Sequence, residues 1–148
     1  MKESVNYNNK NGQVTDIVYN KEEADKVLPL IKSIVRDIVE DFVKLREAGK
    51  TKRKVELIEG KRFESSVLNK LNEDIQNLSN KIEAYINELS QFNISVRDIE
   101  LGIVDFPGLK DGESIFLSWK LGELEVLWWH PVDKCFSDRM LISVPTLD

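Results

Sequence analysis

Residues 68–92, LNKLNEDIQNLSNKIEAYINELSQF, decide the fold of this chain. Apolar side chains recur in this stretch at alternating intervals of three and four residues. They are Leu68, Leu71, Ile75, Leu78, Ile82, Tyr85, Leu89 and Phe92. This spacing places them along one face of an α-helix, as in a seam between two helices. The stretch therefore predicts a long helix that packs against another helix.

A matching helix is predicted upstream, beginning at Asn20. Glu23 follows Asn20 by three residues, which is typical of a capping box. Pro29 predicts a kink near the helix start, and Gly49 predicts its end. A basic run at residues 50–54 then predicts a polar, solvated connection. The apolar residues of this upstream helix recur at the same intervals of three and four as those of the downstream stretch: Leu28, Ile31, Val35, Ile38, Phe42 and Leu45. Two such helices joined by a connection predict a long antiparallel hairpin over about residues 20–92.

The pattern changes from helical to alternating after residue 93. Alternation predicts strands at residues 99–103 and 113–119. An apolar run that would be buried on parts of both faces predicts a further strand at residues 125–130, and a last strand is predicted at residues 140–144. Turns are predicted at residues 106–108, 111–112 and 121–123. We therefore expect an α+β fold in which the hairpin packs with a small, mainly antiparallel sheet over about residues 96–144. The single domain would span residues 15–148, after a flexible polar tail over residues 1–14.

Charge is distributed unevenly along the 148 residues, whose formal net charge is −5. Residues 94–148 hold five basic and ten acidic residues, whereas residues 1–93 hold sixteen of each. The same last third contains all three tryptophans, the single His130 and the single Cys135. This distribution disfavours a nucleic-acid partner, which requires clustered basic residues. The polar start and the absence of a long apolar run predict a cytoplasmic protein without a membrane partner.

Four polar residues of the predicted sheet are candidates for a ligand-binding site: Asp105, Glu123, His130 and Arg139. A histidine, carboxylates and an arginine together can bind an anion or transfer a proton. Trp129 is the candidate aromatic wall; Trp128 and Trp129 point to opposite faces of a strand, so at most one of them lines such a site. The structural alternatives are a hydrogen-bonded histidine at a strand end and tryptophans that belong to the core.

Metal and redox chemistry find little support in the residue counts. One His and one Cys cannot form a zinc site built from several such ligands, and one Cys cannot form an internal disulfide. Glu123 and His130 lie roughly 23 Å apart if the intervening strand is extended, so these two alone are not expected to share a metal. No cofactor is predicted. A divalent metal at the carboxylate of Asp105 or Glu123 is the weaker alternative.

The chain resembles a bacterial family known as domain of unknown function 2203. The resemblance rests on the segments Tyr19-Asn20-Lys21-Glu22-Glu23-Ala24, Leu28-Pro29-Leu30, Gly102-Ile103-Val104-Asp105-Phe106-Pro107, Leu117-Ser118-Trp119, Gly122-Glu123 and Trp129-His130, and on Arg139. It implies an α+β domain in which Asp105, Glu123, His130 and Arg139 are functional, but it implies no reaction. Ser118 stands where the family has Cys, so thiol chemistry is not essential there. Cys135 and Asp138 stand where the family has Gly, which implies a stiffer loop before Arg139.

Two functions remain open on the sequence. The first is a small cytoplasmic binding domain with a polar site on the sheet, or an enzyme acting on a small anionic ligand there. The second is an interaction or self-association module that forms a homo-oligomer through the helical hairpin, since seams of six to eight apolar positions suit packing within or between chains.

Overall fold

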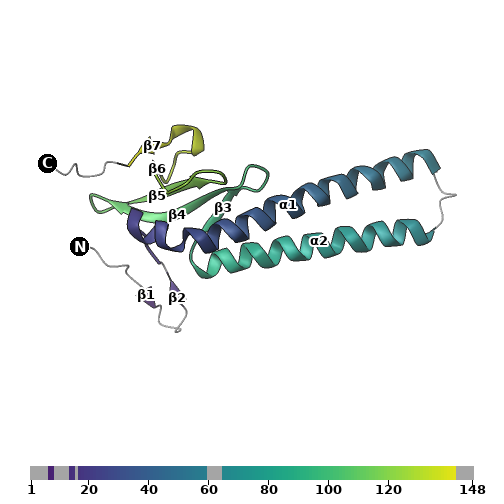
Figure 1. Ribbon diagram of the computed structural model, residues 1–148, viewed down its shortest axis with the longest axis horizontal. Helices are drawn as coiled ribbons and strands as arrows, with labels where there is room; N and C mark the ends of the chain where they lie inside the picture. Colours follow the sequence, from purple (N-terminus) through teal and green to yellow (C-terminus); the bar gives the residue numbers. More distant parts are fainter. Residues whose placement is uncertain (1–6, 9–13, 16, 60–64, 143–148) are drawn as a thin grey trace.

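A computed structural model describes residues 7–8, 14–15, 17–59 and 65–142, and shows a helical hairpin joined to an antiparallel sheet (Figure 1). The helices are α1 (Lys21–Glu59) and α2 (Ser65–Gln91). The main sheet has the order β3-β4-β5-β6-β7. Its strands are β3 (Ser95–Asp98), β4 (Ile103–Lys110), β5 (Glu113–Lys120), β6 (Trp128–Pro131) and β7 (Met140–Leu141). The predicted α+β class with a helical hairpin is confirmed.

Helix α1 begins as predicted and continues further than predicted. The backbone N–H of Asn20 donates to Glu23 Oε1 (3.0 Å), and the N–H of Glu23 donates to Asn20 Oδ1 (2.8 Å), which completes the capping box. The predicted end at Gly49 is wrong, because the helix continues to Glu59. The basic run at residues 50–54, predicted as a connection, is part of this helix. A helical glycine costs only about 1 kcal/mol relative to alanine, and the Lys, Arg and Glu residues that follow favour a helix.

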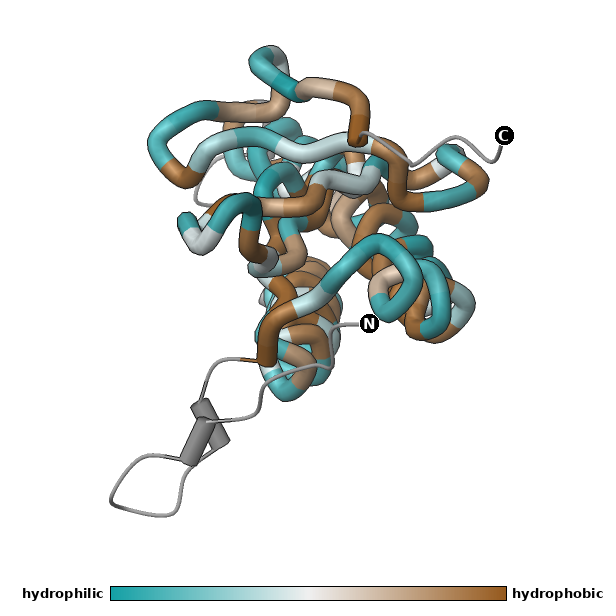
Figure 2. Tube along the Cα trace, turned by 90° about the vertical axis from the view of Figure 1, so that its left-hand side faces the viewer, coloured by the Kyte–Doolittle hydropathy of each residue, from teal (hydrophilic) through white to brown (hydrophobic). Residues whose placement is uncertain are grey.

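The two helices pack side by side. They cover the sheet only with the part of the hairpin that holds the start of α1 and the end of α2. Their far halves project beyond the sheet (Figure 1). Brown and teal segments alternate along the helices in Figure 2, as expected where each helix has one apolar face. The buried α1 residues lie no further along that helix than Asp41; they are Ala24, Leu28, Ile31, Ile34, Val35, Ile38 and Asp41. In the far half, by contrast, Leu57 of α1 is 80% exposed and Val67 of α2 is 44% exposed.

One face of the sheet joins the helices in a single apolar core. Val104, Phe106, Leu117 and Trp119 belong to the same buried cluster as the α1 residues. Because side chains alternate between the faces of a strand, Asp105 and Ser118 point to the opposite face. We call this opposite side the outer face of the sheet. It carries the candidate polar residues.

One strand prediction and one turn prediction are wrong, and one interaction explains part of the difference. Residues 99–102 form the turn between β3 and β4, so the predicted strand at residues 99–103 has only its last residue in β4. Residues 106–108 are not a turn; they lie inside β4 and pair with β5. Pro107 is tolerated there because β3 pairs only with residues 103–105, and the Pro107 carbonyl instead accepts from the Tyr19 N–H (2.8 Å). Gly108 leaves room for this crossing, since a Cβ there would lie 3.1 Å from Tyr19 O.

The remaining turns agree with the sequence. Asp111 and Gly112 have φ values of 52° and 83°, and they form the two-residue loop between the paired residues Lys110 and Glu113. Gly122, at φ 107°, lies in the predicted turn after β5. The last strand is shorter than predicted, and residues 143–144 lie outside the described residues. So does most of the predicted tail, within which β1 (Tyr7–Asn8) pairs with β2 (Val14–Thr15).

Helix composition also bears on the membrane prediction. No helix within the described ranges combines the length and the apolar character that crossing a membrane requires.

Candidate functional site

The outer face of the sheet brings Asp105 and His130 together across an intervening strand. Asp105 on β4 lies opposite Ser118 on β5, and His130 on β6 lies opposite Phe116 on β5. The Asp105 and His130 side chains meet above β5, with His130 Nε2 3.2 Å from Asp105 Oδ1. Both side chains are fully buried. Two of the four predicted site residues are thus direct partners.

Arg97, which the sequence analysis did not identify, completes this group. Its Nε donates to Asp105 Oδ2 (2.7 Å), and its Nη2 lies 2.5 Å from the same oxygen. Arg97 is 37% exposed, whereas its two partners are buried, so it is the member that reaches solvent. Its guanidinium also lies over the Phe116 ring, 5.6 Å from the centroid. We call Arg97, Asp105 and His130 the outer-face triad.

The charge of the triad depends on the protons that His130 and Asp105 hold. His130 Nδ1 lies 2.8 Å from the carbonyl oxygen of Pro131, and Nε2 faces Asp105 Oδ1. A carbonyl and an ionised carboxylate accept hydrogen bonds but cannot donate them. A neutral imidazole carries one N–H, so it can donate to only one of these two acceptors. Both contacts are therefore hydrogen bonds only when Asp105 and His130 together hold one additional proton. With that proton the pair is neutral, and Arg97 leaves the triad with one positive charge.

Ser118 lies beside this triad with its hydroxyl unsatisfied. Its side chain is fully buried, and its Oγ has no hydrogen-bond partner among the described residues. Such buried polar atoms are rare, because desolvating a hydroxyl without a partner costs about 1–3 kcal/mol.

Glu123 and Arg139 form a second, separate pair. Arg139 donates through Nη1 to Glu123 Oε1 (3.1 Å), and its Nη2 lies 2.9 Å from Oε2, which is the two-pronged geometry of a strong ion pair. Glu123 Oε1 also accepts from the backbone N–H of Lys120 (2.9 Å). The sequence left Arg139 to bind either an anion or a carboxylate, and the structure shows the carboxylate.

The Arg139 guanidinium lies between two aromatic rings. Its carbon is 4.9 Å from the Trp128 centroid and 3.9 Å from that of Phe136, which belongs to the short helix Phe136–Asp138. No hydrogen bond or ion pair between described residues joins this pair to the outer-face triad. The four predicted residues therefore form two pairs, not one cluster.

Trp129 lies on the other face, as expected if the two adjacent tryptophans point in opposite directions. It is opposite Leu117, a core residue, while Trp128 is opposite Ser118. Lys110 Nζ lies 5.3 Å from the centroid of the Trp129 ring. Trp128 is thus the tryptophan that accompanies the polar residues of the outer face, and Trp129 lines a cavity on the helix side.

A signal for Arg97 was present in the sequence. Ile94 and Val96 alternate with Ser95 and Arg97, which is the strand pattern, but the predicted strand began at residue 99. Moving that strand to Ser95–Asp98 places Arg97 on the same face as Asp105. The error in the strand boundary therefore hid a site residue.

The acidic residues of the sheet do not form a cation site in the described ranges. No group of three or more His, Cys, Asp or Glu side chains there is arranged to hold a metal ion. Asp105 pairs with Arg97, and Glu123 pairs with Arg139. In the loop before Arg139, Cys135 donates through its backbone N–H (3.3 Å) and its thiol (3.3 Å) to Asp138 Oδ2, which lowers the pKa of the Asp138 carboxyl.

Comparison with known proteins identifies a family but no activity. The model of a family described as "Uncharacterized conserved protein (DUF2203)" matches residues 18–142. A search of curated proteins and a search of solved structures each gave no significant match. The matched range contains both helices, the five-stranded sheet and all the site residues described above.

Proposed function

The chain belongs to this family of uncharacterised conserved proteins, and we propose that it is a small binding domain for an anionic ligand on the outer face of its sheet. The observation that carries the proposal is the hydrogen-bond count at His130, whose two ring nitrogens both face acceptors. When both nitrogens donate, the outer-face triad carries one net positive charge. The proposed ligand is a small carboxylate or phosphate.

An anion would offset the positive charge of the triad, which the Asp138 carboxylate offsets only in part from a distance. Asp105 is the one carboxylate of the described residues that contacts Arg97 or His130. Transferring an uncompensated charge into a protein interior is costly, so a counter-charge beside it is favoured. A guanidinium has five N–H donors, of which the contacts to Asp105 use two. The other donors of the partly exposed Arg97 are available to a ligand, which would approach over Phe116.

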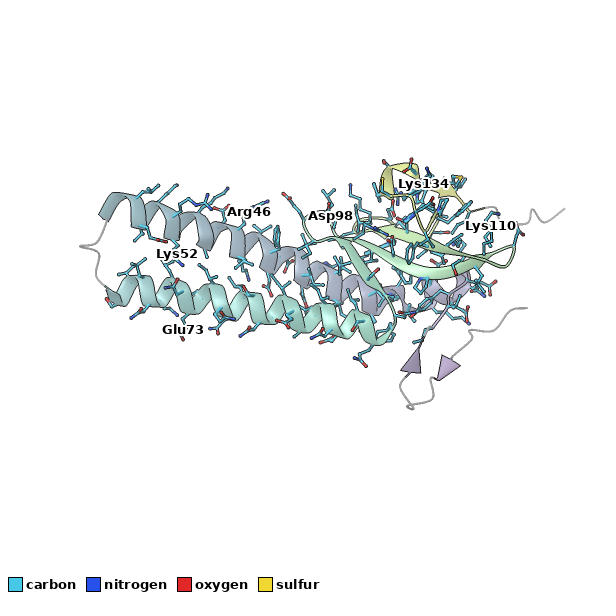
Figure 3. All side chains as sticks on the ribbon, turned by 180° about the vertical axis from the view of Figure 1, so that it is seen from behind. Arg46, Lys52, Glu73, Asp98, Lys110 and Lys134 are labelled. Atoms are coloured by element: carbon cyan, nitrogen blue, oxygen red, sulfur yellow. The ribbon has the colours of Figure 1, made fainter. Side chains whose placement is uncertain are left out.

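The test compares arginine variants in a matched pair. Arg97→Gln removes the accessible charge of the triad. Arg46→Gln is the control. Arg46 lies on α1, away from the triad (Figure 3). Like Arg97, it pairs with a carboxylate, that of Glu100, and lies over an aromatic ring, that of Phe42. Tm and isothermal titration would be measured with inorganic phosphate and with acetate, against chloride at the same ionic strength, at pH 6 and pH 8.

We expect saturable binding of phosphate or acetate by the wild-type chain. Arg97→Gln should weaken it by about tenfold or more, as is usual for the loss of a charged hydrogen bond, and Arg46→Gln should not. His130→Gln, which cannot carry a positive charge, should also weaken binding, provided that circular dichroism shows a native fold. Equal binding by wild type and Arg97→Gln, or no binding of either anion, would refute the proposal.

Self-association through the hairpin is a second candidate, favoured by an apolar groove on the hairpin. The groove has a volume of about 250 Å³ and is lined mainly by Phe42, Leu45, Ile82, Ile86 and Ile99. Charge is also complementary between the helices: residues 44–57 of α1 hold six basic and two acidic residues, whereas α2 holds two basic and four acidic ones. A second copy that crosses α1 over α2 would pair these charges and cover the groove.

Sedimentation of the purified protein over a wide concentration range tests this second candidate. A dimer that dissociates in high salt and on Leu57→Gln substitution would support it, because Leu57 is 80% exposed and its loss should not affect folding. A monomer at every concentration would exclude self-association. The cytoplasmic location and the absence of a nucleic-acid partner stay predictions.

A further inference from the structure

A cavity of about 240 Å³ lies between the start of α1 and the helix-facing side of the sheet. Its wall is largely apolar and includes Ile115, Leu117, Trp129 and Ile142. Drug-sized ligands occupy roughly 300–1,000 Å³, so this volume limits the occupant to a small molecule. An apolar cavity of about 150 Å³ already accepts benzene, so one aromatic ring fits.

Lys110 supplies a positive charge at this cavity. It lines the cavity at the end of β4, near the tip of the β4–β5 hairpin (Figure 3). Its ammonium lies over the Trp129 ring, and no carboxylate among the described residues pairs with it. Lys21 also lines the cavity, but its ammonium is held by Asp25 (2.6 Å) and Glu125 (2.8 Å). Lys110 is therefore the lysine of this wall whose charge a ligand can use.

The wall has two further polar side chains, Tyr19 and Asn20, and both are already engaged. Asn20 Oδ1 accepts from the backbone N–H of Glu23 (2.8 Å). The Tyr19 hydroxyl donates to the carbonyl of Phe92 (2.7 Å). A ligand held here is thus recognised by a largely apolar wall that includes the aromatic side chains of Tyr19 and Trp129, and by one ammonium. This combination selects a molecule with an apolar body and a single negative charge.

We propose that this cavity binds a small organic carboxylate, with its apolar body against Trp129, Ile115 and Leu117 and its carboxylate on Lys110. The site is independent of the outer-face triad, because the Trp129 and Leu117 side chains lie on the opposite face of the sheet from Asp105 and Ser118. The two sites also differ in ligand chemistry, since the triad offers no comparable apolar wall.

Benzoate and hexanoate are suitable probes, and benzyl alcohol is the uncharged control for benzoate. Binding would be followed by tryptophan fluorescence and by isothermal titration on the full chain. Lys110→Gln removes the charge. Lys120→Gln is the matched control, because Lys120 is a lysine at the other end of the β4–β5 pair. Trp129→Phe removes the reporting indole but keeps an aromatic wall, so calorimetry should still detect binding when the fluorescence change is lost.

We expect benzoate to bind at least about fivefold more tightly than benzyl alcohol, since a contact with a charged group exceeds a neutral one in strength. Lys110→Gln should abolish that preference, whereas Lys120→Gln and Arg97→Gln should preserve it. An unchanged preference in Lys110→Gln, or no binding of either acid, would overturn the inference. Retention of benzoate binding in Arg97→Gln separates this site from the proposed phosphate or acetate site, so one can fail while the other stands.

Discussion

Tyr19 connects three parts of the chain that are distant in sequence. Its hydroxyl donates to Phe92 O at the end of α2, its backbone N–H donates to Pro107 O in β4, and its ring packs edge-on against Phe106 (5.3 Å between centroids). The residue is 6% exposed. Burial raises the pKa of Tyr19 to about 12, with a smaller contribution from the charge of Glu23.

This raised pKa predicts a loss of stability at high pH. The fold favours the protonated phenol, so the contribution is fully present below pH 10, the ordinary value, and is lost as pH rises through about 12. At pH 11 the loss should be about 1 kcal/mol relative to pH 9. Urea unfolding of wild type and Tyr19→Phe at both values measures it, because the difference between the proteins isolates Tyr19. A difference independent of pH would contradict the prediction.

Ser118 predicts a stabilising substitution. Its buried hydroxyl lacks a partner, so Ser118→Ala removes a desolvation penalty and should raise the free energy of unfolding by about 1 kcal/mol. Ser114→Ala, an exposed serine of the same strand, serves as the control and should change stability by less than about 0.5 kcal/mol. Both follow from urea unfolding. Destabilisation by Ser118→Ala would mean that the hydroxyl has a hydrogen-bond partner in solution.

At the residue scale, the polar residues of the sheet were easier to predict than the contacts between them. Asp105, Glu123, His130 and Arg139 were identified by type, and each makes a charged contact. The pairing of Asp105 with His130 was not predictable, because they are 25 residues apart and meet across β5. Whether these residues bind a ligand stays a prediction.

Among the elements, α1 shows how a local signal for a helix end is overridden. The residues around Gly49 favour a helix strongly enough to continue it past the glycine. In this segment the Thr51 hydroxyl donates to Glu47 O (3.1 Å). A Cβ at Gly49 would meet nothing within 4 Å. The helix continues because a single glycine costs less than the hydrogen bonds and packing that continuation provides.

Gly49→Ala should therefore stabilise the protein by about 0.5–1 kcal/mol, through a less flexible unfolded chain and better helix propensity. Gly112→Ala is the contrasting variant. Its site also has space for a Cβ, but its φ of +83° strains any L residue, so it should destabilise. Thermal and urea unfolding of the two variants give the comparison, and a destabilised Gly49→Ala would argue against a continuous α1.

Across the whole molecule, stability should be unevenly distributed along the hairpin. The end of the hairpin beside the sheet carries the buried core, whereas the far end is a two-helix projection with partly exposed apolar residues (Figure 1). Regions with few buried contacts open locally at low free energy. The far half should thus fluctuate more than the half that rests on the sheet.

Native-state hydrogen exchange checks this expectation. Amides of residues 50–57 and 66–72 should exchange through local opening, faster than those of residues 31–38 and 82–89, whose exchange should approach the global unfolding free energy. Uniform protection along both helices would contradict it. If the hairpin self-associates, protection of the far half should rise with protein concentration.

The sequence by itself determined the features that depend on near neighbours. The three-and-four spacing specified both helices, Asn20 with Glu23 specified the capping box, and Asp111-Gly112 specified the tight β4–β5 turn, because each is encoded within a few residues. Tertiary structure decided where β3 and β4 begin, how Pro107 fits inside a strand, and which charges meet. Those outcomes depend on contacts between distant segments, such as Tyr19 with Pro107 and Asp105 with His130, whose register no local pattern specifies.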